Sequence, residues 1–138
     1  MFSRRWFNTL AVLLLAGLLT GCPVMQKRPP GKILKLKEPA TQRSYHLYVP
    51  TWYDDSLQWP LVITLQGTDV WDGPLRQAEE WGLLAETHGF IVVAPNMDST
   101  QGILPNRRGP WFEDLAADEQ VILSLIDELA SQYNIDRK

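Results

Sequence analysis

Residues 61–94 read LVITLQGTDVWDGPLRQAEEWGLLAETHGFIVVA, and this stretch decides the fold. Its two ends, residues 61–65 and 90–94, are short apolar runs rich in β-branched residues, which is typical of strands covered on both faces. Between them, Pro74 and Gly89 stand where a helix would begin and end. The apolar residues of this helix recur at steps of three and four: Leu75, Ala78, Trp81, Leu84 and Ala85. The pattern predicts a β-α-β unit with a right-handed crossover and two parallel strands.

Two further strands are predicted before this unit. Residues 32–37 and 43–49 approach the alternation of apolar and polar side chains that half-buried strands show. Residues 38–41 connect them, and Pro50 ends the second strand because proline has no N–H to donate to a ladder. We therefore expect an antiparallel hairpin at one edge of the sheet.

A second helix is predicted from about Leu115 to Tyr133, after an irregular stretch over residues 95–110. Its apolar stripe consists of Val121, Ile122, Leu125, Ile126, Leu129 and Tyr133. Four acids cluster near its start: Glu113, Asp114, Asp118 and Glu119. Negative charge that complements the helix dipole explains these acids more simply than a metal site does. Residues 134–138 leave the helix where a third parallel strand would begin.

The N-terminus has the pattern of an export signal. Residues 1–7 carry Arg4 and Arg5 and no acid, and an unbroken apolar stretch covers residues 10–19. A stretch of this length suits a signal-peptide core of roughly 7–15 residues and is too short for a membrane-spanning helix of about 20. We therefore interpret residues 1–21 as a signal peptide. The two arginines also resemble a twin-arginine motif, but any positive n-region supplies them, so ordinary unfolded export is favoured.

The signal ends in Leu19-Thr20-Gly21-Cys22, which resembles the lipobox of bacterial lipoproteins. In that pattern the Cys22 thiol takes a diacylglyceryl group, and cleavage leaves lipidated Cys22 at the N-terminus. Two or three acyl chains, at about 0.8 kcal/mol per buried methylene, would anchor the chain stably to membrane lipid. The resemblance implies the bacterial cell envelope, and Pro23 rather than aspartate after the cysteine favours the outer membrane, facing the periplasm or the cell surface. An ordinary cleaved signal with a chance cysteine is the alternative.

Composition limits the partners of the remaining chain. Two of the 13 basic residues lie within residues 1–21, so 11 remain against 16 acidic residues. This balance does not recruit nucleic acid. Cys22 is the one cysteine, so no intramolecular disulfide can form. Residues 22–31 are rich in proline and read as a lipidated linker, which leaves residues 32–138 for one small domain.

Several sequence segments of this domain resemble the polyhydroxybutyrate-depolymerase and feruloyl-esterase branch of the α/β-hydrolases. The resemblance covers Ser44 to Lys138. The residues that carry it are 45–50 (YHLYVP), 59–68 (WPLVITLQGT), 85–95 (AETHGFIVVAP), 111–112 (WF) and 127–137. It implies a three-layer α/β fold with a mostly parallel sheet, an antiparallel N-terminal hairpin and a truncation before the strand that carries the nucleophile.

The same resemblance implies a candidate oxyanion hole. Residues 61–65 of this chain match a strand of that family. In the family, the turn after this strand supplies a backbone N–H that stabilises charge on the tetrahedral intermediate of acyl transfer. Here the role would fall to Thr68, with Gly67 allowing the backbone to approach the substrate. Many relatives have histidine where this chain has Gln66. A plain strand-to-helix turn is the equally weighted alternative.

No catalytic residue is assigned in this chain. The nucleophile elbow G-x-S-x-G is absent from the 138 residues. His46 and His88, the two histidines, are interpreted as structural. The resemblance implies a serine carboxylic-ester hydrolase that acts on an ester substrate only if other residues complete it, and that is inactive alone. A non-catalytic envelope lipoprotein with a binding or structural role is the alternative.

Other chemistries lack support in the sequence. It has neither a glycine-rich phosphate loop nor a cluster of cysteine and histidine ligands, so no cofactor and no metal are predicted. Asp69 and Asp72 are attributed to loop polarity and to capping of the helix that begins at Pro74. Four tryptophans lie in loops, and packing is favoured over a role in a substrate cleft for them: Trp52, Trp59, Trp71 and Trp111. No pattern decides the oligomeric state.

Overall fold

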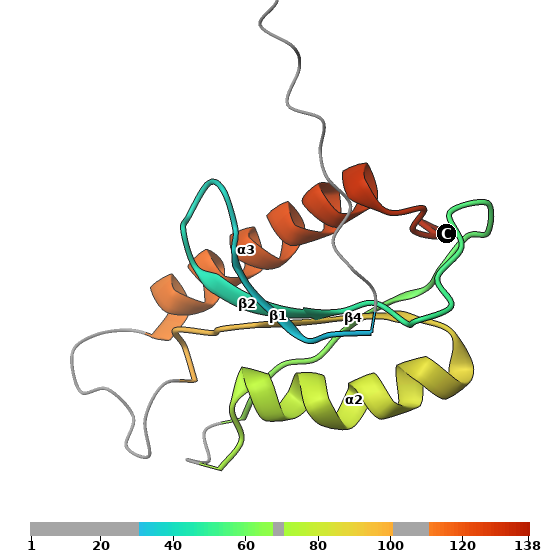
Figure 1. Cartoon of the computed structure of the whole chain (residues 1–138). Helices are drawn as coiled ribbons and strands as arrows, with labels where there is room; N and C mark the ends of the chain where they lie inside the picture. The colour runs from blue at the N-terminus through green and yellow to red at the C-terminus, as the bar shows by residue number, and fades with distance from the viewer. Residues whose placement is uncertain (1–30, 68–70, 101–110) are drawn as a thin grey trace, which may run out of the picture.

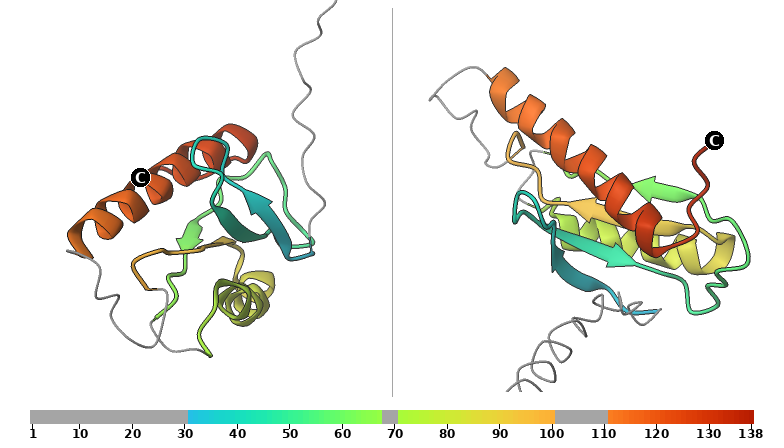
Figure 2. Two further views of the ribbon diagram at one scale, coloured as in Figure 1. Left: turned by 90° about the vertical axis from the view of Figure 1, so that its left-hand side faces the viewer. Right: turned by 90° about the horizontal axis from the view of Figure 1, so that it is seen from above.

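The computed structural model describes residues 31–67, 71–100 and 111–138. The predicted signal peptide, Cys22, the linker as far as residue 30 and Thr68 lie outside the described residues. The described chain forms three layers, with one sheet between two helices that cover its opposite faces (Figure 1). Figure 2 shows the same layers from the side and from above.

The sheet contains four strands in the order β1-β2-β4-β3. They are β1 (Leu34–Lys37), β2 (Ser44–Tyr48), β3 (Leu61–Ile63) and β4 (Ile91–Pro95). β1 pairs antiparallel with β2, β2 pairs antiparallel with β4, and β3 pairs parallel with β4. The predicted hairpin and parallel pair are therefore confirmed. The described sheet is mixed rather than mostly parallel, because the hairpin supplies two of its four strands and joins β4 in the antiparallel sense.

Helix α2 (Pro74–His88) packs on β2 and β4 and ends at Gly89, whose φ is 79°. Its bounds are those predicted, and the predicted stripe is confirmed at Ala78 and Ala85 but not at its large residues. The residues turned to the sheet are Ala78, Gly82 and Ala85, whereas the predicted stripe residues Leu75, Trp81 and Leu84 are 47%, 38% and 47% exposed. The reason is the close approach of helix and sheet. A Cβ atom at Gly82 would lie 3.3 Å from the ring of Tyr48.

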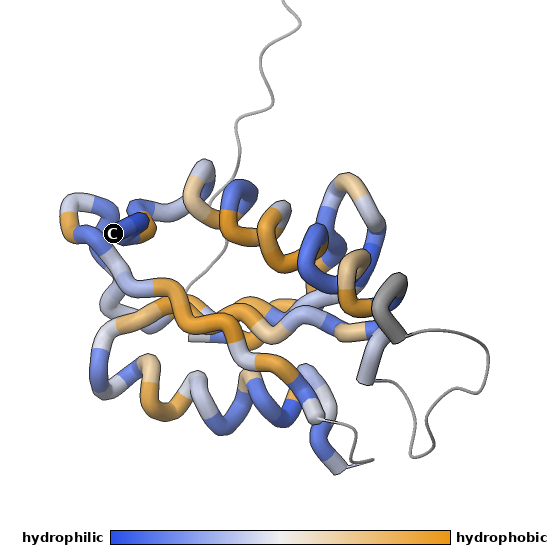
Figure 3. Tube along the Cα trace, turned by 180° about the vertical axis from the view of Figure 1, so that it is seen from behind, coloured by the Kyte–Doolittle hydropathy of each residue, from blue (hydrophilic) through white to orange (hydrophobic). Residues whose placement is uncertain are grey.

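Helix α3 (Trp111–Gln132) covers the other face and begins four residues earlier than predicted. Its predicted stripe is confirmed at Val121, Leu125 and Leu129, which are fully or almost fully buried. The main core lies between α3 and the sheet and comprises Tyr45, Leu47, Val49, Trp59, Ile91, Val93, Val121, Leu125, Leu129, Tyr133 and Ile135. Hydrophobic residues accordingly concentrate in the middle layer (Figure 3). Among the described residues no helix has the length and apolar character to cross a bilayer.

The tryptophans divide between core and surface. Trp59 is 2% exposed and contacts Trp52 and Tyr53, with ring centroids 4.8 Å and 5.2 Å away. The packing interpretation is confirmed for Trp59. It is wrong for Trp71, which is 74% exposed in the turn before α2.

The chain returns to the sheet after α3. Ile135 forms a parallel bridge with Trp59, two residues before β3. The Trp59 N–H donates to the Asn134 carbonyl at 2.8 Å, and the Asp136 N–H donates to the Trp59 carbonyl at 2.9 Å. This segment therefore enters the sheet beside β3 on the side away from β4, where a third parallel strand was predicted to begin.

Candidate active site

The candidate site lies where the carboxyl ends of the parallel strands β3 and β4 meet. Such edges are where open α/β sheets bind ligands. The ladder continues past β3, because the Thr64 N–H donates to the Val93 carbonyl at 2.9 Å. Gln66 then extends its amide to Thr100 in the loop that follows β4, with 3.2 Å between Nε2 and Oγ1. The two strand ends are thereby joined by a side-chain contact.

The turn after β3 holds Gly67, one of the two oxyanion-hole candidates. The Gly67 N–H donates to Oδ2 of Asp72 at 2.6 Å, and Oδ1 of Asp72 accepts from Gln77 Nε2 at 2.5 Å. Hydrogen bonds from Gln77 and then from the Gly67 amide hold the pKa of Asp72 below its usual range. A Cβ atom at residue 67 would lie 3.0 Å from Oδ2, so the small residue suits this close contact.

This contact corrects the interpretation of Asp72 as a helix cap. The N-cap of α2 is Gly73, which makes no side-chain capping hydrogen bond. The Asp72 carboxylate instead turns back to the strand end, because the Gly67 N–H lies within reach of it. A carboxylate oxygen thus already occupies the Gly67 N–H that an oxyanion would need. Thr68, the other candidate donor, lies outside the described residues.

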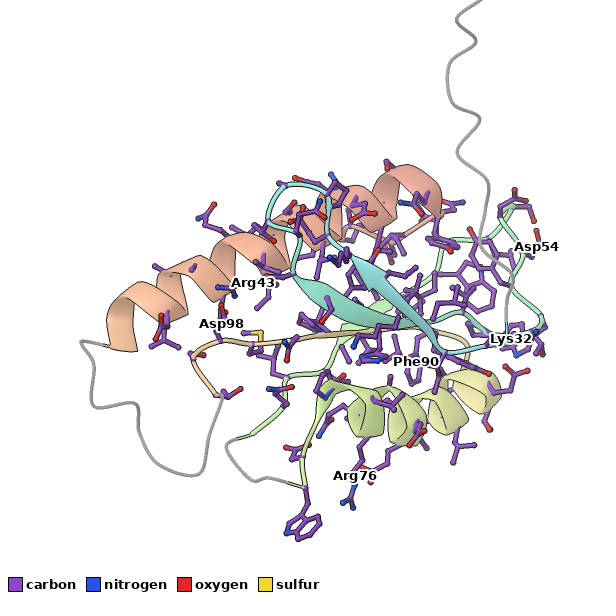
Figure 4. The ribbon with its side chains drawn as sticks, turned by 60° about the vertical axis from the view of Figure 1, so that its left-hand side comes forward. Lys32, Arg43, Asp54, Arg76, Phe90 and Asp98 are labelled. Atoms are coloured by element: carbon purple, nitrogen blue, oxygen red, sulfur yellow. The ribbon has the colours of Figure 1, made fainter. Side chains whose placement is uncertain are left out.

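The loop after β4 is fastened to α3 by a buried carboxylate. Asp118 is 1% exposed and accepts hydrogen bonds from the Asp98 and Ser99 N–H groups at 3.1 Å and 3.0 Å. It also pairs with the Arg43 guanidinium, which reaches Oδ2 of Asp98 at 2.6 Å. Figure 4 shows Arg43 and Asp98 side by side at this end of the sheet. Burial alone would raise the pKa of Asp118, but hydrogen bonds from Ser99, Asp98 and Arg43 outweigh burial and lower it.

The prediction that Asp118 complements the helix dipole is therefore wrong. Because α3 begins at Trp111, Asp118 lies about two turns inside the helix, beyond the reach of the dipole. A signal for its burial was present in the sequence. Asp118 precedes Val121 and Leu125 by three and seven residues, so it continues the buried stripe of α3.

Neither histidine lies in the turn after β3. His46 is in β2, paired with Ala94 of β4, and is 8% exposed. Burial and then the charge of Lys35 lower its pKa, which favours the neutral imidazole. His88 is the last residue of α2, about 20 Å along the helix from the Asp72 end. Within the described residues no group of three or more cysteine, histidine or acidic side chains could hold a metal ion. Asp69 lies outside them.

The buried polar atoms without a hydrogen-bond partner among the described residues include His46 Nδ1, Thr64 Oγ1 and Gln66 Oε1. Thr64 and Gln66 are two residues apart at the end of β3, so their side chains share one face of the sheet. Val62, two residues before Thr64, lies on the same face and pairs with Val92. Val92 in turn pairs with Tyr48, whose ring lies against Gly82 of α2. Thr64 and Gln66 therefore lie on the face that α2 covers.

Comparison with known proteins relates the chain to esterases. No family model matches it. It is 28% identical over 102 residues to a bifunctional acetylxylan esterase/xylanase of Neocallimastix patriciarum, which covers 74% of this chain and 14% of that protein. It also resembles the CE1 ferulic acid esterase of Anaeromyces mucronatus. The TM-score is 0.52 at 17% identity for the complex with ferulic acid and 0.53 at 18% identity for the substrate-free form.

The comparisons support an esterase-like hydrolase relationship and a partial α/β-hydrolase fold. The structural match covers 83% of this chain and 50% of each esterase chain, so the chain spans about half the length of the solved esterases that it resembles.

Proposed function

We propose that this chain supplies the N-terminal part of a serine carboxylic-ester hydrolase. The observation that carries the proposal is the turn at Gln66 and Gly67, which follows a parallel strand in a sheet of the order β1-β2-β4-β3. The sequence relationship to an acetylxylan esterase supports it. In this role the main-chain N–H groups of the turn stabilise the negative charge that develops on the carbonyl oxygen during acyl transfer.

The contact between Asp72 and Gly67 assigns different roles to the two candidate donors. Because the Gly67 N–H already donates to Asp72, we assign it a part in catalysis only when the Asp72 carboxylate moves away, and we keep Thr68, which lies outside the described residues, as the other proposed donor. The serine, histidine and acid of the reaction come from residues outside these 138, which contain no nucleophile elbow. The chain alone is therefore proposed to be inactive toward esters.

Hydrolysis of p-nitrophenyl acetate and p-nitrophenyl butyrate by the purified chain tests this proposal. We expect no turnover above the buffer background. Turnover that a serine-directed fluorophosphonate abolishes would contradict the inactive state. The coding sequence after codon 138 provides the complementary test. A G-x-S-x-G motif about ten codons downstream in any frame would support a divided hydrolase.

We further propose that the domain is tethered to the bacterial envelope, with the outer membrane favoured, through lipidated Cys22. The sequence of residues 1–22 supports this proposal. Metabolic labelling with a clickable fatty acid tests it. We expect label on the native chain and none on Cys22→Ala, with Ser44→Ala as a matched control that keeps the label. Equal labelling of the Cys22→Ala variant would contradict the anchor.

The second candidate is a non-catalytic envelope lipoprotein with a binding or structural role. The occupied Gly67 N–H favours it, because the Asp72 carboxylate satisfies this donor without a substrate. Unrelated sequence after codon 138, together with a monomer that unfolds cooperatively, would favour this candidate over a divided hydrolase.

A further inference from the structure

The chain enters the described fold at one end of the sheet. The Gly31 N–H donates to the Val49 carbonyl at 2.6 Å, just past the end of β2. The turn that follows is fixed to the last part of α2. There the Glu86 carboxylate accepts from the Thr51 N–H at 2.9 Å, and the Trp52 indole donates to the Glu86 carbonyl at 2.8 Å. The point of entry therefore lies beside the carboxyl end of α2.

The candidate turn lies at the other end of the sheet. Because β2 runs antiparallel to β4, the end of β2 stands beside the beginning of β4, whereas the turn follows the carboxyl end of β3. Gly67 is six residues past the start of β3, which is about 20 Å at about 3.3 Å per residue. Helix α2 gives the same separation, because Glu86 follows Asp72, the partner of Gly67, by 14 residues, or about 20 Å of helix. Figure 4 shows Lys32 and Asp98 at these opposite ends.

The point of entry and the candidate turn also lie at opposite edges of the sheet. The first strand after the point of entry, β1, forms one edge, and β3, which leads to the candidate turn, forms the other. With three spacings of about 4.8 Å between the four strands, the two edges are about 14 Å apart. Gly31 and Gly67 therefore stand at diagonally opposite corners of the domain.

The β1 edge carries positive charge beside the point of entry. Its exposed side chains are Lys32, Lys35 and Lys37, and the leucines between them are half-buried. Lysine at a sheet edge prevents pairing with another strand, and near an anionic membrane each lysine also adds attraction. The end of the domain with the candidate turn instead exposes the carboxylates of Asp114 and Glu119 near the start of α3, which an anionic surface repels. The charges therefore favour lipid at the β1 edge.

The tether between Cys22 and the fold is short. Nine residue steps separate Cys22 from Gly31, and a flexible chain of this length has an r.m.s. span of about 15–18 Å. The candidate turn stands about 20 Å beyond Gly31 along the strands. To point this turn at the lipid, the domain would have to hold Gly31 that far from the surface and keep the tether stretched, which costs conformational entropy.

We propose that the tethered domain turns its β1 edge and its Gly31 end toward anionic lipid, and its turn at Gln66 and Gly67 toward water. Its substrate is therefore an ester of the aqueous phase rather than a lipid of the anchoring bilayer. This inference rests on the proposed tether at Cys22, and it deepens the proposed esterase role by naming the side from which the substrate arrives.

NMR relaxation in nanodiscs tests this orientation. The discs contain equal parts of phosphatidylglycerol and phosphatidylcholine, with a gadolinium chelate on some headgroups. The full-length chain is joined to a maleimide lipid through the thiol of Cys22, its one cysteine, so the result does not depend on lipidation in cells. We expect the relaxation enhancement of the Lys35 and Thr51 amides to exceed that of Gly67 and Gly73 by about tenfold or more, because it falls with the inverse sixth power of distance over about 20 Å. The fatty-acid label and the ester assay report separately on the proposed tether and the proposed activity.

A gadolinium chelate dissolved in water gives the reciprocal measurement on the same tethered chain. It enhances the relaxation of amides that water reaches, so lipid at the β1 edge shields that edge from it. We expect tethering to weaken its effect at Lys35 and to leave its effect at Gly67 unchanged.

A matched pair of double variants tests the lysines of the β1 edge. Lys35→Gln/Lys37→Gln should lower the headgroup enhancement along β1 by about twofold or more, because each lysine adds attraction to the anionic surface. The control is Arg76→Gln/Arg137→Gln, which removes two exposed positive charges elsewhere on the domain. We expect the control to leave the enhancement along β1 unchanged.

Three results would overturn the proposal. The first is a headgroup enhancement at Gly67 that equals or exceeds the one at Lys35, because the exposed Trp71 beside the turn would then be the contact with lipid. The second is a loss of access of the dissolved chelate to Gly67 when the chain is tethered. The third is an equal effect of the two double variants, because the β1 edge would then not be the part of the domain that meets the anionic surface.

Discussion

Glu38 is the group whose removal tests the energetics of this fold most directly. It lies in the β1–β2 turn, 1% exposed. Its carboxylate accepts four hydrogen bonds, from the Ala40 N–H at 2.9 Å, the Thr41 N–H at 2.5 Å, the Thr41 hydroxyl at 2.6 Å and the Ser124 hydroxyl at 2.7 Å. The last bond ties the hairpin to α3, so Glu38 links two layers of the molecule.

The charged form of Glu38 is strongly favoured in the folded state. Burial alone would raise its pKa, but the hydrogen bonds from Thr41, Ala40 and Ser124 lower the pKa from 4.5 to about 2. At about 1.36 kcal/mol per pH unit, this difference corresponds to about 3 kcal/mol. Glu38 itself is buried, but residues 39–42 beside it are exposed, so water screens part of this interaction and we expect about 2 kcal/mol.

The sign of the pH dependence follows from the lowered pKa. A carboxylate whose folded pKa lies below its unfolded value stabilises the fold above the unfolded value and loses this effect as pH falls. For Glu38 the stabilisation is complete above about pH 5 and is lost between pH 4.5 and pH 2. Glu38→Gln removes the charge with little change of shape, so the free energy of unfolding should fall by about 2 kcal/mol at pH 7.

Guanidinium unfolding followed by tryptophan fluorescence measures this effect at pH 7, pH 4 and pH 2. The control is Glu119→Gln, an exposed glutamate of α3, which removes the same charge. We expect the Glu38→Gln variant to differ from the native chain at pH 7 and to converge on it by pH 2, while the control differs little throughout. Equal stabilities of the two variants at pH 7, or a difference that persists unchanged at pH 2, would refute the reasoning.

Three further predictions follow from other contacts. Asp118→Ala leaves two N–H groups without their acceptor and removes the buried one of the two carboxylates that pair with Arg43, so we expect a loss of about 3–5 kcal/mol in guanidinium unfolding, against less than about 1 kcal/mol for the exposed Asp127→Ala. Gly89→Ala places a Cβ atom 2.6 Å from a tryptophan ring at a φ of 79°, so thermal unfolding should occur at a lower temperature by several degrees, a shift worth about 1 kcal/mol or more. Asp72→Asn replaces the charged acceptor of the Gly67 N–H, so the amide proton of Gly67 should move upfield in the NMR spectrum, and an unmoved resonance would exclude the contact in solution.

The elements of the fold were largely predictable because their signals are local. The β-branched runs at residues 61–65 and 90–94 became β3 and β4, and Pro74 and Gly89 bound α2 as expected. The side of each helix that packs on the sheet was less predictable. Periodicity correctly placed Ala78 and Ala85 in the buried stripe of α2, but it also placed Leu75 and Trp81 there, and these two are exposed. Periodicity identifies an apolar stripe but not how closely the neighbouring layer approaches.

The candidate site, too, was predictable from the sequence only in part. The turn at Gln66 and Gly67 could be located from its place after an apolar strand, but the hydrogen bond from Gly67 to Asp72 could not. Whether a loop carboxylate caps a helix or turns back to a strand depends on which N–H lies within reach, and only the folded turn decides this. The same holds for Asp118, whose partners come from Arg43 and from residues 98 and 99, far away along the chain.

By itself, the sequence determined the order of strands and helices, the parallel β-α-β unit, and the motif at Cys22 on which the proposed anchor rests, because each depends on residues close together in the chain. Only the tertiary structure decided the position of β3 at the edge of the sheet, its parallel bridge with Ile135, and the partners of its buried acids. These features depend on contacts between segments far apart in the chain, whose geometry no local pattern encodes.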